Sequence, residues 1–300
     1  FPDRASDPVS SFTYREILTL DAGSWFNESY PDRARNSYNG LKIATLEQLI
    51  NIAEGKNPDG TADKNDGGNR PGLYLETKKA FLFPGIEKDL HDMLEERGWL
   101  TPKNNPALTE GRVNIGEQKG RLVLQTFQPS SLPLLNQYMP DVPKTYLVEL
   151  WDEEPGFPQE GPDMAKDLSR THGPVRKITG EWTELAKSRR TAVVKSKENF
   201  RMWIEWAKAN GATGTGPSMD VKSGEFSNLV LPWMNDMTHE LSLYIHAWTI
   251  DEMEEIHATR LLGIEGIFTN RADVAIRYFK KNDKLTSTAT KEEIFRRYGF

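Results

Sequence analysis

Cysteine is absent from the 300 residues, which excludes disulfides, zinc thiolates and thiol nucleophiles from the chemistry of this chain. Long apolar runs are also absent. The longest, such as Leu241–Trp248, have the length of a strand, whereas a membrane span needs about 18 apolar residues or more. No signal-peptide pattern opens the sequence at Phe1. These absences argue against stable insertion into a membrane.

A strong positive charge is missing as well. The net charge is −6, and no run of Lys and Arg reaches the density that is typical of a nucleic-acid surface. Nucleic acid is therefore not expected as a partner. If the substrate is a small anion, a local cation or a bound metal has to attract it, because the overall field of the protein does not.

What the chain has is the composition of a globular protein. Hydrophobic residues make up 37% and charged residues 27%, and the length suits one large α/β domain. We expect a single barrel domain over residues 1–300, with an insertion around 151–180 that is rich in Pro, Gly and charge.

Short apolar segments alternate with segments of helical periodicity, which predicts βα units and a parallel sheet. The six strands expected are Gly72–Lys78, Arg121–Phe127, Thr145–Leu150, Gly214–Pro217, Leu241–Trp248 and Gly266–Thr269. The helices expected are Phe12–Asp21, Thr45–Glu54, Pro84–Arg97, Ser131–Tyr138, Lys195–Asn210, Asp251–Leu262 and Arg271–Lys280. A closed (β/α)8 TIM barrel needs eight strands, so two strands are expected upstream of Phe1.

Candidate chemistry lies in Tyr74–Lys78, with the sequence YLETK. Alternation along a strand sends Tyr74, Glu76 and Lys78 to one face. At the C-terminal end of a barrel strand, Glu76 would suit a divalent metal and Lys78 an anionic substrate. The alternative from these residues alone is an ion pair at the end of a strand.

Six segments in order resemble the glycerophosphodiester phosphodiesterase family, particularly its bacterial periplasmic-type members. They are Leu20–Phe26 (LDAGSWF), Tyr74–Lys78 (YLETK), Leu124–Phe127 (LQTF), Gly214–Ser218 (GTGPS), His246–Thr249 (HAWT) and Gly266–Asp273 (GIFTNRAD). The resemblance implies a TIM barrel that uses Ca²⁺ or Mg²⁺ to hydrolyse small anionic glycerophosphodiesters to an alcohol and glycerol 3-phosphate. It also implies a role in lipid and glycerol metabolism and a periplasmic or extracellular location, as for secreted proteins.

The family's other catalytic residues have no match in this chain. Members carry a His-Arg-Gly motif, a His-Asp pair and a Glu-x-Asp motif on the first two strands, and a later Glu and Lys that match Glu76 and Lys78. No His-Arg-Gly occurs here. One carboxylate holds a hard cation weakly, and proton transfer needs a positioned acid, so we expect the chain to be inactive without its N-terminal catalytic segment.

The resemblance also implies that aromatic residues at Phe127 and Trp248 line the substrate site. For Trp248 the alternative is an ordinary core position, and for His246 a buried structural histidine is the favoured interpretation. Asn270 replaces the Asp that is more usual at its place, which puts the hydrogen bonds of the last loop in doubt.

Two other functions stay open. The chain is either a barrel that acts as a binding or scaffold protein without catalysis, or a phospholipase similar to sphingomyelinase D. The polar composition of the insertion, which has no apolar stripe for a membrane, favours small diesters over lipids.

Overall fold

The computed structural model describes residues 1–4, 7, 9–68, 70–78, 80, 83–100, 113–115, 118–148, 197–220 and 227–280. Contacts divide the chain into two compact units, one built on Phe1–Leu73 and the other beginning at Tyr74. The insertion expected around 151–180 lies outside the described residues. The expected organisation as a single barrel domain over residues 1–300 also stays a prediction.

The N-terminal unit is built from short helices. They are η1 (Pro2–Arg4), η2 (Val9–Ser11), α1 (Tyr14–Ile17), α2 (Ser24–Ser29), η3 (Pro31–Arg33), η4 (Asn36–Tyr38) and α3 (Leu46–Ala53). The helix expected at Thr45–Glu54 is confirmed as α3. Its start is fixed by a capping box, in which Gln48 N–H donates to the Thr45 hydroxyl at 3.2 Å and Thr45 N–H donates to Gln48 Oε1 at 3.0 Å. The helix expected at Phe12–Asp21 forms over α1 only.

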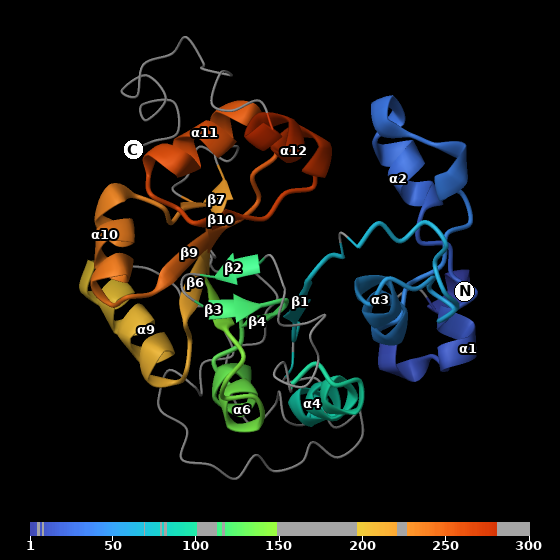
Figure 1. The fold of residues 1–300 in the computed structure, drawn as a ribbon, viewed down its shortest axis with the longest axis horizontal. Coiled ribbons are helices and arrows are strands. Elements are labelled where there is room, and N and C mark those ends of the chain that lie inside the picture. The colour runs from blue at the N-terminus through green and yellow to red at the C-terminus, as the bar shows by residue number, and fades with distance from the viewer. Residues whose placement is uncertain are drawn as a thin grey trace. The chain divides into compact units, whose positions relative to one another are not determined.

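Six strands form one parallel sheet in the order β1-β4-β5-β6-β9-β10 (Figure 1). They are β1 (Leu73–Glu76), β4 (Leu122–Thr126), β5 (Lys144–Val148), β6 (Gly214–Pro217), β9 (Tyr244–Ala247) and β10 (Gly266–Ile267). Each coincides with one of the six expected strands, which confirms an α/β fold with the sheet of a half-barrel. Two short antiparallel hairpins accompany it, β2 (Val113–Ile115) with β3 (Gln118–Gly120) and β7 (Met219–Asp220) with β8 (Ser227–Asn228).

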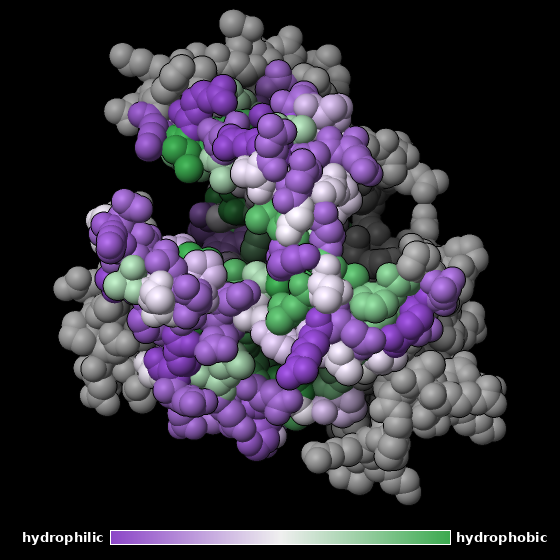
Figure 2. Space-filling model, turned by 90° about the vertical axis from the view of Figure 1, so that its right-hand side faces the viewer, coloured by the Kyte–Doolittle hydropathy of each residue, from purple (hydrophilic) through white to green (hydrophobic). Residues whose placement is uncertain are grey.

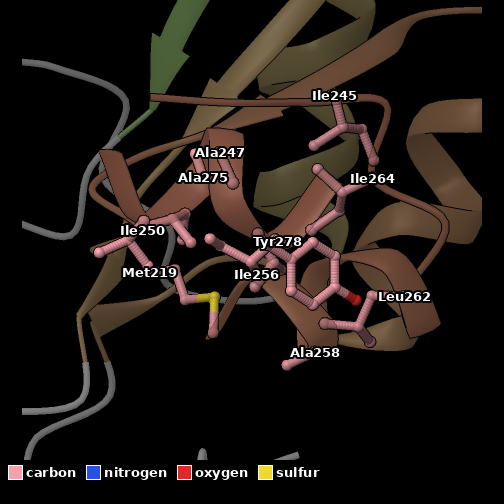
Figure 3. Packing of buried hydrophobic residues seen from close by; sticks show 12 residues of the cluster. Met219, Ile245, Ala247, Ile250, Ile256, Ala258, Leu262, Ile264, Ala275 and Tyr278 are labelled. Atoms are coloured by element: carbon pink, nitrogen blue, oxygen red, sulfur yellow. The ribbon is translucent and has the colours of Figure 1, made fainter. Parts of the chain in front are cut away.

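Helices surround the strands of this second unit (Figure 1). They are α4 (Ile86–Glu96), α6 (Ser131–Tyr138), α9 (Lys197–Ala209), α10 (Pro232–Glu240), α11 (Met253–Leu261) and α12 (Ala272–Lys280). On the outer face of β5, Tyr146 stacks on Trp203 of α9 with ring centroids 6.2 Å apart. Figure 3 shows a second core, in which the ring of Tyr278 lies among Ile256, Leu262 and Ile264. The outer faces of the strands are thus covered by apolar helix faces.

The sequence missed α10 and placed the start of β9 too early. The segment Pro232–Glu240 has little helical periodicity in its apolar residues, but Pro in the first turn is a common helix start. The helix ends at Glu240 with Leu241 as its C-cap. Ser242 follows with a φ of 55°, and its N–H donates to His239 O at 2.7 Å. The strand therefore begins at Tyr244, three residues after the expected Leu241.

Polar residues dominate the face shown in Figure 2, with smaller apolar areas between them. Within the described ranges, no helix combines the length and the apolar composition that crossing a bilayer requires.

The inner face of the sheet depends on a glycine in β6. An ideal Cβ on Gly214 would lie 2.1 Å from the ring of Tyr244 on the neighbouring strand β9. Backbone and ring therefore pack at a distance that no side chain on residue 214 would permit.

Replacing Gly214 with Ala is expected to lower the free energy of unfolding by about 1–3 kcal/mol, because the ring of Tyr244 must move out of a packed interior. Gly67→Ala is the control, since a Cβ there meets no atom within 4 Å. Chemical denaturation of both variants measures the difference. Equal stability of Gly214→Ala and the parent chain would contradict this account of the interior.

Candidate active site

A hydrogen-bonded network joins the inward side chains of β1, β5 and β9. The Tyr74 hydroxyl pairs with the Thr145 hydroxyl and with His246 Nδ1, the latter at 3.0 Å. The Thr145 hydroxyl also pairs with the Tyr244 hydroxyl at 2.9 Å. The two tyrosines come from strands on opposite sides of β5, so the sheet must be curved with these side chains on its concave face.

This network is neutral at neutral pH. Burial raises the pKa of Tyr74 and of Tyr244, and burial lowers the pKa of His246 to about 4. His246 is only 9% exposed and has a hydrogen-bond partner, which agrees with its interpretation as a structural histidine.

Glu76 follows Tyr74 by two residues and shares its face of the strand. Its Oε1 atom is buried and has no hydrogen-bond partner among the described residues. Burial raises the pKa of Glu76, and the positive charge of Lys78 opposes that rise. Lys78 itself is exposed. The structure thus brings Glu76 and Lys78 together, with the carboxylate inside and the ammonium in contact with solvent.

Phe127 and Trp248 lie at the C-terminal ends of β4 and β9 and contact each other. Their rings meet edge to face with centroids 5.5 Å apart. Trp248 is oriented by its indole N–H, which donates to Gly216 O of β6 at 2.8 Å. Because two strands lie between β4 and β9, this ring contact spans the concave face of the sheet. The two aromatic residues expected to line one site therefore form one pair.

The loop after β10 is fixed to the loop after β9. Asn270 N–H donates to Asp251 Oδ1 at 2.7 Å, and the Thr269 hydroxyl donates to the same oxygen at 3.1 Å. The Asn270 side chain adds a contact to Asp251 Oδ2 at 3.3 Å. The backbone and side-chain amides of Asn270 thus fix this loop to Asp251.

The side-chain oxygens near the end of β1 are of the type that binds a divalent cation, but the described residues supply few of them. Glu76 offers a buried carboxylate oxygen, and Gln125 of β4 offers a buried amide oxygen that likewise lacks a partner among the described residues. Hard divalent cations bind oxygen ligands of this kind, but prefer six or more of them. In the part of the chain that the structure describes, no three His, Asp or Glu side chains are grouped so as to hold a metal. The sequence predicts Gln125 in the region of Phe127 but assigns it no role.

Comparison with known proteins gives one curated relative and several solved structures, while no family model matches the sequence. The curated relative is a glycerophosphodiester phosphodiesterase of Bacillus subtilis (strain 168), 24% identical over 266 residues, which are 89% of this chain and 64% of that protein. A crystal structure described as a candidate glycerophosphoryl diester phosphodiesterase of Silicibacter pomeroyi DSS-3 matches with a TM-score of 0.52 at 18% identity, covering 90% of this chain and 68% of that one. One from Galdieria sulphuraria matches with a TM-score of 0.47 at 16% identity, covering 90% and 70%.

The resemblance to the glycerophosphodiester phosphodiesterase family is confirmed. The chain spans less than two thirds of the Bacillus phosphodiesterase, and the match to the Silicibacter structure supports a common fold. The positions of Glu76, Lys78, Phe127 and Trp248 in the phosphodiesterase site stay a prediction.

The buried histidine predicts how stability depends on pH. Unfolded His246 has its ordinary pKa of 6.5 and folded His246 a pKa of about 4, so between these values the unfolded state binds more protons and acid favours unfolding. The contribution of neutral His246 to the free energy of unfolding is fully present above pH 6.5. It is lost as the pH falls to about 4, and the loss amounts to up to about 3 kcal/mol.

His246→Gln, which retains a polar partner for Tyr74, should therefore lose less stability than the parent chain between pH 7 and pH 4.5. Urea unfolding at the two pH values measures this difference. If both proteins lose the same free energy, His246 is not the buried neutral group described here.

Proposed function

We propose that this chain carries part of the active site of a metal-dependent glycerophosphodiester phosphodiesterase. In the reaction, water attacks the phosphorus, the bond to one alcohol oxygen breaks, and the products are that alcohol and glycerol 3-phosphate. The proposal depends chiefly on one observation: at the C-terminal end of β1, Glu76 lies beside Lys78 and has a buried oxygen that finds no partner in the described part of the chain. The curated relative of that name supports the same activity.

Glu76 would hold the divalent cation, Ca²⁺ or Mg²⁺, through its carboxylate. Burial opposes ionisation of Glu76, so the carboxylate is held in a place where a positive ligand stabilises it strongly. When bound, the cation would neutralise charge on the phosphate and polarise its oxygens. The buried Oε1 supports this role, because a surface ion pair would leave both carboxylate oxygens in water.

Lys78 would bind a phosphate oxygen and stabilise the negative charge that develops on it, which makes it the catalytic residue of this half of the site. It follows Glu76, the last residue of β1, by two positions, and its positive charge acts on the Glu76 carboxyl group, so its ammonium would reach a phosphate held beside Glu76. Its exposure is consistent with contact to a ligand that enters from solvent.

Phe127 and Trp248 would bind the carbon atoms of the glycerol or of the leaving alcohol. The edge-to-face pair is oriented by the hydrogen bond of the Trp248 indole and offers an apolar surface at the carboxyl ends of β4 and β9. Carboxyl ends of the strands are where barrel enzymes place their active sites.

The remaining parts of the site would come from an N-terminal catalytic segment with the two further strands of a complete barrel. That segment would supply the general acid and base and the other carboxylates, and this chain alone should not turn over substrate. A periplasmic or extracellular location and a role in lipid and glycerol metabolism form part of the same proposal.

Glu76→Gln should abolish stabilisation by Ca²⁺ or Mg²⁺. In the parent chain, millimolar cation should raise the melting temperature, and the variant should show no rise because the charge that holds the cation is gone. Without cation the variant should be at least as stable as the parent, since it removes a carboxylate whose pKa burial raises. Differential scanning fluorimetry measures both effects.

Glu87→Gln on α4 is the matched control for this experiment. Glu87 is another buried carboxyl group whose pKa burial raises, but it lies outside the proposed site. It should leave the cation effect intact. A cation effect that survives in Glu76→Gln would remove Glu76 from the metal site.

Lys78→Met should lower turnover by about 10²–10³ in a form that includes the N-terminal catalytic segment, because an ammonium aimed at the developing charge is lost. Thermal stability should stay nearly unchanged, since Lys78 is exposed. Release of glycerol 3-phosphate from glycerophosphocholine measures the rate. Lys88→Met on α4 removes an exposed lysine elsewhere and should keep full activity. A Lys78→Met enzyme that is less stable but equally active would show a structural role instead.

A further inference from the structure

The side chain of Gln125 lies on the inner face of the sheet. Val123, two residues earlier on β4, packs against Tyr74 and Tyr244, and alternation places Gln125 on that same face. On the opposite face, the Thr126 hydroxyl donates to Thr77 O at 3.3 Å. Gln125 is only 9% exposed. Its amide therefore points into the interior that holds the candidate site.

The ladder between β1 and β4 sets Gln125 directly beside Glu76. Thr77 N–H donates to Gln125 O at 3.1 Å, and in a parallel pair this bond makes the residue before Thr77 the lateral neighbour of Gln125. Neighbouring strands are about 4.8 Å apart, so side chains on one face at such a pair are within reach of one common ligand. The side chains of Glu76 and Gln125 are therefore adjacent.

Both side chains end in a buried oxygen that no described donor satisfies, Glu76 Oε1 and Gln125 Oε1. Leaving one such acceptor unpaired costs about 1–3 kcal/mol, and more when the group is charged. Nearby buried polar groups of the interior do have partners, as the network of Tyr74, Thr145 and His246 shows. Two adjacent acceptors without a donor among the described residues are oxygen ligands of the kind that a hard cation binds.

We infer that Gln125 supplies a second protein oxygen to the cation that Glu76 holds. This inference rests on the proposed function, and it adds a neutral ligand from β4 to the carboxylate from β1. An amide oxygen adds coordination without adding charge, so it strengthens the site without a second like charge next to Glu76.

Gln125→Met tests the inference, because it keeps the length of the side chain and removes its oxygen. Titration of the purified chain with CaCl₂ in a calorimeter should show about tenfold weaker binding than in the parent. The cation-free melting temperature should be unchanged or higher, since an unpaired buried acceptor is gone. Gln125→Glu, which retains an oxygen there, should bind Ca²⁺ at least as tightly as the parent.

Gln128→Met is the matched control. Gln128 is also a buried glutamine after β4, but its Oε1 already accepts Ala80 N–H at 3.3 Å. The control should lose thermal stability and keep the parent's affinity for Ca²⁺.

Three outcomes separate this inference from the proposed function. If the parent binds Ca²⁺ and Gln125→Met binds it equally well, the inference fails and the proposed function stands. If the parent itself binds no Ca²⁺, the metal part of the proposed function fails together with the inference. A lower cation-free melting temperature in Gln125→Met would also overturn the inference, because it would show that the amide stabilises Glu76 as a hydrogen-bond donor.

Discussion

The hydrogen bond between the Tyr74 hydroxyl and His246 Nδ1 joins the first strand of the sheet to the fifth, and the candidate site depends on it. Two residues further along the same faces lie Glu76 and Trp248, each one step closer to the carboxyl ends of the strands. Any change in the curvature that brings Tyr74 to His246 would therefore shift the carboxylate and the indole relative to each other. The neutral network is the base on which the charged and aromatic groups are placed.

Polarity changes along the concave face from the network to the carboxyl ends of the strands. At the network, hydroxyl and imidazole groups satisfy one another and burial keeps them uncharged. Two residues further along, Glu76 and Gln125 each present an oxygen for which the described residues supply no donor. Buried polar groups without a hydrogen-bond partner commonly occur in proteins where a ligand binds to them. Such groups lower the stability of the ligand-free fold. The two adjacent acceptors are therefore the main support for the proposed cation site.

Sequence patterns were sufficient for the strands because strand length, turn residues and alternation with helices are local signals. The expected segments at Gly214–Pro217 and Ser131–Tyr138 match β6 and α6 residue for residue. The helix α10 was missed because its apolar residues face the core from an irregular pattern, and β9 was placed too early because Leu241 completes α10. In both cases tertiary packing, which a single sequence does not display, decided the boundary.

The same distinction applies to the candidate site. Parity along one strand was enough to select Glu76 and Lys78 together, and motif resemblance was enough to select Phe127 and Trp248. The sequence places Gln125 in the region of Phe127 but gives it no role, because a role as a ligand follows from the register between β1 and β4 and from its Oε1, which has no partner among the described residues. Neither property can be read from the sequence segment LQTF.

The two edge strands of the sheet bear on both the fold and the proposed metal site. Among the described strands, β1 and β10 each have a neighbour on one side only, and a closed barrel would place two more strands between them. Those strands would also bring side chains next to Glu76, whose buried Oε1 has no hydrogen-bond partner among the described residues. In the proposed function, the same two strands would pair these edges and add ligands beside Glu76. Closure of the proposed barrel and completion of the proposed metal site would therefore depend on one segment.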